Sequence, residues 1–233
     1  MTWQEKWLKY KSVDEMTKSY TQIKICGLRS AKAASVASEC GADFLGFVFV
    51  DGVRRQLQPD EAAQIINEYR GSTQVSKSIK LVGLFRNQSV DFVNQTAAKT
   101  NLDFVQLCGE ENSDYVSRLN LPIFRQIRVK DGTKPNDLYK TVESHLNAGH
   151  RVVLDRFDID TPGGSGRSFN WSAAEGVAEQ NHVLLAGGLK SENVQAAISQ
   201  LAPWGVDVSS GVETDGIKDP KLIKTFIETV RAI

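Results

Sequence analysis

From residue 23 to the C-terminus, short apolar runs alternate with amphipathic segments, and this alternation constrains the fold more than any other feature. The apolar runs are Ile23–Cys26, Phe44–Val50, Ile79–Phe85, Phe104–Leu107, Ile123–Ile127, Val152–Asp155, Val183–Ala186 and Val206–Val208. Short, nearly continuous and β-rich runs predict strands that are buried on both faces of a parallel sheet. The amphipathic segments predict helices at Ala31–Glu39, from Pro59 onward, and at Ser89–Lys99, Ser113–Leu119, Asp137–Leu146, Ser172–Glu179, Glu192–Ser199 and Pro220–Ala232.

Eight strand–helix units within 233 residues predict an α/β fold, a single (β/α)8 TIM barrel that we place at residues 21–233. A doubly wound open sheet is the competing fold. It usually has fewer units and carries GxGxxG after its first strand, which Cys26-Gly27-Leu28 does not supply.

Residues 1–20 precede the repeating pattern. Their apolar side chains fall on one face of a helix, namely Trp3, Trp7, Leu8 and Tyr10. We therefore expect an extra N-terminal helix that packs on the barrel, with a partner-binding or linker segment as the alternative.

Composition narrows the functional class. Lys+Arg and Asp+Glu both number 28, so no basic excess offers a surface for nucleic acid. The longest apolar runs, such as Phe44–Val50, are too short to span a bilayer, and residues 1–20 do not read as a secretory signal. Three cysteines without CxxC spacing fit a reducing compartment and argue against a zinc knuckle. We expect a cytoplasmic protein, and a monomer.

In such barrels the active site lies at the C-terminal ends of the strands. Cys26 ends the first run; a lone cysteine is more often a small buried residue, but here a thiolate could abstract a proton. Arg54 and Arg55 follow the second run, either as a solvated pair or as ligands of an anion. Asp155 ends the sixth run and is a candidate general acid or base, preferred over the nearby loop residues Asp158 and Asp160.

Glycine-rich segments follow the last three runs, at 162–166, 186–189 and 208–213. Backbone amides at such glycines can point at an anion, and the loops after strands 7 and 8 commonly bind phosphate in barrels. The expected phosphate-binding residues are Gly164, Ser165, Gly166, Gly187, Gly188, Ser209, Ser210 and Gly211. We therefore expect a small phosphorylated substrate, and the absence of GxxxxGK[ST] argues against ATP.

The three histidines, His145, His150 and His182, do not fall at strand C-termini, so a histidine-based metal site or triad has little support. We expect no metal and no cofactor.

Several of these segments together resemble the phosphoribosylanthranilate isomerase family of tryptophan biosynthesis. They are Lys24-Ile-Cys-Gly-Leu, Leu45-Gly-Phe-Val-Phe, Arg55-Gln-Leu, Leu81-Val-Gly-Leu-Phe, Val105-Gln-Leu, Gly163-Gly-Ser-Gly, Leu185-Ala-Gly-Gly-Leu, Glu192-Asn-Val and Gly205-Val-Asp-Val-Ser-Ser-Gly-Val-Glu. The likeness runs from about Ile23 to the C-terminus.

The resemblance implies an Amadori rearrangement that converts N-(5-phosphoribosyl)anthranilate to 1-(2-carboxyphenylamino)-1-deoxyribulose 5-phosphate without a cofactor. It implies Cys26 as the general base and Asp155 as the general acid. Arg55 would bind the anthranilate carboxylate, and Asp207 would line the anthranilate side. A base that works near neutral pH must be partly thiolate, so we expect the pKa of Cys26 to lie below about 8.5.

The sequence departs from the family pattern at two places. Gln106-Leu-Cys-Gly replaces the usual Gln-Leu-His-Gly, so Cys108 stands where the family has a substrate-side histidine. This change bears on the anthranilate pocket more than on the reaction. The N-terminal extension is the other departure. It could cover the N-terminal face of the barrel, which we favour, or echo fusions with indole-glycerol-phosphate synthase.

Other phosphate-binding barrels fit less well. A ribulose-phosphate epimerase would need histidines and acids around a metal, and the histidine-pathway sugar isomerase would need an aspartate at position 26. Indole-glycerol-phosphate synthase would need a lysine and glutamate set beyond Lys24. A non-catalytic barrel that binds a phosphorylated ligand is supported by Cys108 alone.

Overall fold

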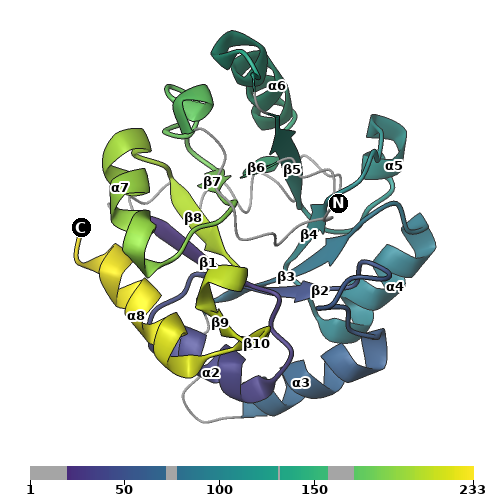
Figure 1. Cartoon of the computed structure of the whole chain (residues 1–233). Helices are drawn as coiled ribbons and strands as arrows, with labels where there is room; N and C mark the ends of the chain where they lie inside the picture. Colours follow the sequence, from purple (N-terminus) through teal and green to yellow (C-terminus); the bar gives the residue numbers. More distant parts are fainter. Residues whose placement is uncertain (1–19, 72–77, 131, 157–170) are drawn as a thin grey trace.

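The computed structural model describes residues 20–71, 78–130, 132–156 and 171–233. Eight parallel strands form a closed barrel in the order of the sequence (Figure 1). They are β1 (Gln22–Cys26), β2 (Phe44–Val48), β3 (Lys80–Phe85), β4 (Phe104–Leu107), β5 (Ile123–Val129), β6 (Arg151–Arg156), β7 (Val183–Leu185) and β8 (Gly205–Val208). The predicted (β/α)8 fold is confirmed. The helix expected within residues 1–20 lies outside the described residues, apart from Tyr20.

Helices form the outer ring of the barrel in Figure 1. They are α2 (Ala31–Glu39), α3 (Pro59–Gly71), α4 (Val90–Thr100), α5 (Ser113–Ser117), α6 (Pro135–Asn147), α7 (Ser191–Leu201) and α8 (Pro220–Arg231). Local signals fix several starts: the hydroxyls of Ser30 and Ser89 accept from Ala33 N and Phe92 N, and Pro220 follows the N-cap Asp219.

The helix predicted at Ser172–Glu179 is wrong. The structure has a single 3-10 turn, η1 (Trp171–Ala174), followed by irregular turns. Gly176 has a φ of +70°, which a right-handed helix cannot accommodate, so the amphipathic pattern there does not extend into a helix.

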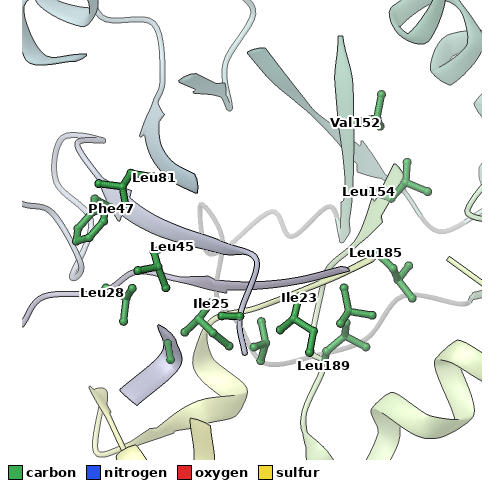
Figure 2. Packing of buried hydrophobic residues seen from close by; sticks show 14 of the residues in the cluster. Ile23, Ile25, Leu28, Leu45, Phe47, Leu81, Val152, Leu154, Leu185 and Leu189 are labelled. Carbon is green, nitrogen blue, oxygen red and sulfur yellow. The ribbon is translucent and has the colours of Figure 1, made fainter. Parts of the chain in front are cut away.

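The strands bury side chains on both faces. The larger cluster lies between the strands and the helices, and Figure 2 shows Ile23, Ile25, Leu45, Leu154 and Leu185 among its members. The second cluster fills the barrel interior. Its members alternate with those of the first along each strand, as the two-residue period of a strand requires.

Aromatic rings fill the N-terminal end of the barrel interior. Phe44, Phe104 and Phe124 meet edge to face, with ring centroids 5.3–6.2 Å apart. The guanidinium of Arg151 lies 4.5 Å from the centroid of the Phe104 ring, and Trp204 lies 6.0 Å from Phe44. Cys26 and Asp155 instead lie toward the other end of the barrel, where β1 and β6 finish.

The end of α8 is tied to the N-terminal side of the barrel by one arginine. Arg231 donates to Thr21 O at 2.6 Å, to Gly41 O at 2.7 Å and to Asp43 Oδ2 at 2.8 Å. Asp43 Oδ2 also accepts from Ile23 N at 2.9 Å. These bonds join the last helix to the first strand. Within the described ranges, no helix combines the length and the apolar character that crossing a membrane would require.

Candidate active site

Strand β1 places Lys24 and Cys26 on the same interior face, because they are two residues apart. Lys24 is fully buried, and its Nζ donates to Asp207 Oδ2 at 2.8 Å. Asp207 lies on β8 at the position that is paired with Lys24 in the sheet. The Lys24 ammonium also interacts with the Cys26 thiol. Three charged or ionisable groups thus meet at the mouth of the barrel, two of them from the first strand and one from the last.

The pKa of Cys26 is raised above its usual range, because burial disfavours the thiolate and Asp207 repels it. Lys24 and Lys218 oppose this shift. This direction contradicts the expected pKa below the free-thiol value. The sequence places Cys26 at the mouth of the barrel, but it does not show that the folded protein leaves this residue only 6% exposed to water.

Asp155 is the penultimate residue of β6, two residues beyond Val153, which belongs to the interior cluster. Gln126 Nε2 donates to Asp155 Oδ2 at 2.6 Å, and Arg156 N donates to Oδ1 at 2.8 Å. Burial and the charge of Asp207 nevertheless raise the pKa of Asp155 to about 6. This carboxyl can be protonated near neutral pH, as a general acid must be.

Arg55 packs against Gly27, the residue that follows Cys26, and its guanidinium is paired with a carboxylate. Nε and Nη2 donate to the two carboxylate oxygens of Glu213, each at 2.7 Å. The Arg55 side chain lies directly over Gly27, where an added Cβ would overlap Arg55 Cδ. Gly27 also has a φ of +76°. Glycine is therefore needed at this position both for the left-handed backbone and for the space that Arg55 occupies. Arg54 is more than half exposed and approaches Glu213 from outside.

Cys108 follows β4 and packs against the interior cluster. Gln106 Nε2 lies 3.7 Å from its sulfur, and Arg128 Nη2 donates to its carbonyl at 3.3 Å. Burial and the nearby Cys26 raise the pKa of Cys108 to about 12. Cys108 is therefore a neutral thiol on the same face as Cys26, and it does not supply the charge or the hydrogen-bonding reach of a histidine.

The expected phosphate loops after β7 and β8 meet each other. Gly187 and Gly188 both have positive φ values, of +88° and +68°. A side chain at Gly211 would overlap Leu189 O, so the two loops are in direct backbone contact. Ser209 Oγ donates to Cys26 O at 3.0 Å, and Ser210 begins the 3-10 turn η2 (Ser210–Val212). Gly164, Ser165 and Gly166 lie outside the described residues.

Sequence reasoning missed four residues of this site. Gln126 donates to Asp155, and Lys24 pairs with Asp207. Glu213 binds both Arg55 and Lys218, and it belongs with Lys218 to a short hairpin of β9 (Glu213–Thr214) and β10 (Ile217–Lys218). One signal was available: Lys24 is a cation within an apolar run, at the same parity as Cys26. Among the described residues, no group of three or more histidine, cysteine or acidic side chains could hold a metal ion.

Comparison with known proteins agrees with this geometry. Residues 23–229 match the family model described as N-(5'phosphoribosyl)anthranilate (PRA) isomerase. The N-(5'-phosphoribosyl)anthranilate isomerase of Geotalea uraniireducens is 40% identical over 214 residues, which are 91% of this chain and 100% of that protein. Its counterpart from Thermoanaerobacter pseudethanolicus is 39% identical over 91% of this chain and 98% of its own length.

Solved structures give the same result. The phosphoribosyl anthranilate isomerase of Thermotoga maritima superposes with a TM-score of 0.78 at 29% identity, covering 91% of this chain and 100% of that one. A phosphoribosyl anthranilate isomerase in complex with reduced 1-(o-carboxyphenylamino)-1-deoxyribulose 5-phosphate superposes with a TM-score of 0.74 at 28% identity, with the same coverage. The match of the family model over residues 23–229 and the 40% identity to a curated member show that this chain belongs to the N-(5'-phosphoribosyl)anthranilate isomerase family.

Proposed function

We propose that this chain catalyses the reaction of its family, the Amadori rearrangement of N-(5-phosphoribosyl)anthranilate, with Asp155 as the general acid and Cys26 as the general base. The observation that carries the proposal is the pair of interior groups at one end of the barrel: a carboxyl whose pKa is about 6 and a thiol that contacts a buried lysine. The charge of Asp207 acts on both groups.

The first step opens the furanose ring. The bond between C1′ and the ring oxygen breaks, the oxygen takes the proton of Asp155, and the nitrogen lone pair forms a C1′=N⁺ Schiff base. Desolvation favours this step, because it keeps part of the Asp155 population protonated near pH 7.

The second step removes the proton on C2′, which the Schiff base acidifies. The Cys26 thiolate takes this proton, and the electron pair forms a C1′=C2′ enolamine that neutralises the nitrogen. The enolamine then tautomerises, so that C1′ gains a proton, the 2′-hydroxyl loses one and the ketose forms. Lys24 supports the thiolate by its adjacent positive charge.

Binding groups surround this acid–base pair. Asp207 Oδ1 is buried and has no hydrogen-bond partner among the described residues, so it can accept from the anilino N–H of the substrate. Arg55 carries the cation suited to the anthranilate carboxylate, and the loops after β7 and β8 offer backbone amides to the phosphate. Cys108 places a small neutral thiol in this pocket, where the family pattern has a histidine.

The experiment follows the fluorescence of the anthranilate substrate with purified protein, with and without a chelator. Cys26→Ser and Asp155→Asn should each lower kcat by about 10²–10⁴-fold while phosphate-dependent ligand binding persists. Cys40→Ser is the matched control, because Cys40 lies at the end of α2 in the outer cluster. Near-normal turnover of Cys26→Ser would remove the base assignment. A loss on Asp158→Asn instead of Asp155→Asn would move the acid to the loop.

No turnover by the unaltered protein would favour a barrel that only binds its ligand, and sensitivity to the chelator would favour an epimerase-like enzyme. A monomer is also part of the proposal, because only four large hydrophobic residues are exposed in the described part of the chain: Tyr20, Tyr139, Ile217 and Ile233. One structural relative, from Thermotoga maritima, is a dimeric enzyme from which monomers were generated. Analytical ultracentrifugation of this protein tests the proposal, and the mass of a dimer would contradict it. A cytoplasmic location stays a prediction.

A further inference from the structure

One carboxylate in this structure binds three cations. Glu213, whose side chain is 4% exposed, pairs with Arg55 through both oxygens, with Arg54 Nη2 at 2.7 Å and with Lys218 Nζ at 2.5 Å. None of these residues performs the proton transfers described above. The cluster lies where the loop after β2 meets the hairpin after β8.

We propose that Glu213 is a positioning residue for substrate recognition: it fixes the Arg55 guanidinium by one edge and so presents the remaining Nη1 to the substrate carboxylate. This inference rests on the proposed function, because it assumes that Arg55 binds that carboxylate.

The hydrogen bonds of Arg55 carry the first part of the argument. Glu213 takes the Nε and Nη2 edge in a bidentate pair, whereas Nη1 has no hydrogen-bond partner among the described residues. A guanidinium binds carboxylates through its planar edges, so fixing one edge determines the direction of the next. The contact with Gly27 restricts the aliphatic part of the same side chain. Arg55 is thus held at both ends before any ligand arrives.

Lys218 carries the second part. It is almost fully buried, and its Nζ donates to Glu213 Oε1, to Ser209 O at 3.0 Å and towards Ser209 Oγ at 3.4 Å. Ser209 Oγ in turn donates to Cys26 O at 3.0 Å. A continuous set of contacts therefore links Arg55 to the loop after β8 and to the end of β1. Through it, Glu213 sets the position of Arg55 relative to Cys26.

Charge is the third part. Hydrogen bonds from Arg55 and the charge of Lys218 lower the pKa of Glu213 to about 2, so this carboxylate stays ionised at any working pH. Three cations face one anion, which leaves the cluster net positive and still attractive to an anionic ligand. If Glu213 instead competed with the substrate for Arg55, removing its charge would strengthen substrate binding. The two roles therefore predict changes of opposite sign.

The experiment compares two substrates, N-(5-phosphoribosyl)anthranilate and N-(5-phosphoribosyl)aniline, which lacks the carboxylate. Glu213→Gln should lower kcat/KM for the anthranilate substrate by about 10- to 100-fold, mainly through KM, and for the aniline substrate by less than about 2-fold. Asp43→Asn is the matched control, since Asp43 pairs with Arg231 on the N-terminal face, away from the site; it should change both values by less than about 2-fold. In an Arg55→Met background, Glu213→Gln should have no further effect.

Binding provides a second readout. Calorimetry with reduced 1-(o-carboxyphenylamino)-1-deoxyribulose 5-phosphate and its analogue without the carboxyl should show the same selective loss. If Glu213→Gln does not fold, Glu213→Asp keeps the charge but is too short for the bidentate geometry, and it should show the same selectivity. An equal loss for both ligands would mean a purely structural role, and tighter binding of the carboxylated ligand would mean competition; either overturns the proposal. An unaltered protein that does not prefer the carboxylated ligand would instead show that the assignment of Arg55 fails.

Discussion

Lys24 Nζ and Asp207 Oδ2 form a 2.8 Å ion pair inside the barrel, between the first and the last strand. A buried pair of this kind contributes little net stability, because desolvation offsets the attraction. The Lys24 ammonium also interacts with the Cys26 thiol, where its positive charge lowers the thiol pKa and so opposes the effect of burial.

We expect Lys24→Met to raise the pKa of Cys26 further, because the variant removes the largest influence that favours the thiolate. The measurement is the rate of Cys26 alkylation against pH, resolved by peptide so that Cys40 and Cys108 are counted separately. The midpoint should move to higher pH. Lys80→Met is the control, since Lys80 forms a half-exposed 3.6 Å pair with Asp103 at the start of β3. An unchanged midpoint in Lys24→Met would contradict this role.

The two catalytic pKa values predict an unusual pH profile. Asp155 must be protonated although its pKa is about 6, and Cys26 must be ionised although its pKa lies above its usual range. The active form has a protonated Asp155 and an ionised Cys26, whereas the form that dominates between the two pKa values has an ionised Asp155 and a protonated Cys26. Both forms carry one proton, so the fraction of active enzyme does not vary with pH in this range. We expect kcat/KM to rise with pH up to about 6, to stay level, and to fall only above the pKa of Cys26.

Gln126 gives a check on that profile. Its hydrogen bond to Asp155 favours the ionised carboxylate, so Gln126→Leu should raise the pKa of Asp155 and move the lower limit of the profile to higher pH. A profile with a single limit, or a lower limit that does not respond to Gln126→Leu, would show that Asp155 does not set it.

Gly27 allows a test of how Arg55 is placed. Gly27→Ala should cost about 1 kcal/mol of stability through its positive φ, and it should also lower kcat/KM, because the new methyl group displaces Arg55. Gly52→Ala is the matched control: Gly52 has a similar φ of +74° but no atom within 4 Å of the added Cβ. Thermal unfolding and kinetics on both variants separate the two effects. Equal kinetic losses would contradict the steric argument.

The histidine pair at the opposite end of the barrel should make stability depend on pH. His145 Nδ1 and His150 Nδ1 lie 3.3 Å apart, and burial together with His145 and Arg125 lowers the pKa of His150 to about 4. An unfolded histidine titrates near 6.5, so the unfolded state takes up a proton first as the pH falls. The unfolding free energy should therefore decrease between about pH 6.5 and pH 4, by about 2 kcal/mol at most.

Denaturant unfolding at several pH values measures this decrease. His150→Asn should remove most of it, because asparagine does not titrate. A His150→Asn protein with the same dependence on pH as the unaltered one would assign the loss to other groups.

The sequence predicted the strands to within about two residues, because each strand is buried on both faces and so appears as a continuous apolar run. The irregular segment after η1 could not be predicted this way, because its amphipathic pattern continues through Gly176, whose backbone is left-handed. Periodicity reports which side of an element is buried; it does not report a single dihedral angle.

The limits are similar at the site. Cys26 and Asp155 were identifiable as polar residues at the ends of apolar runs. The pairing of Arg55 with Glu213 joins residues 158 positions apart, and no local pattern encodes it. The raised pKa of Cys26 depends on how completely the folded barrel removes water from the thiol. The local sequence around Cys26 does not encode this burial either.

Barrel closure between β1 and β8 has a consequence for the synthesis of the chain. Lys24 and Asp207 are 183 residues apart, so a ribosome makes Cys26 and Lys24 early and the partner carboxylate near the end. Until β8 is made, Lys24 lacks this counter-ion and β1 keeps an open edge; Arg55 gains Glu213 only when β9 follows. The nascent chain therefore carries the residues proposed for proton transfer long before the barrel that places them can close.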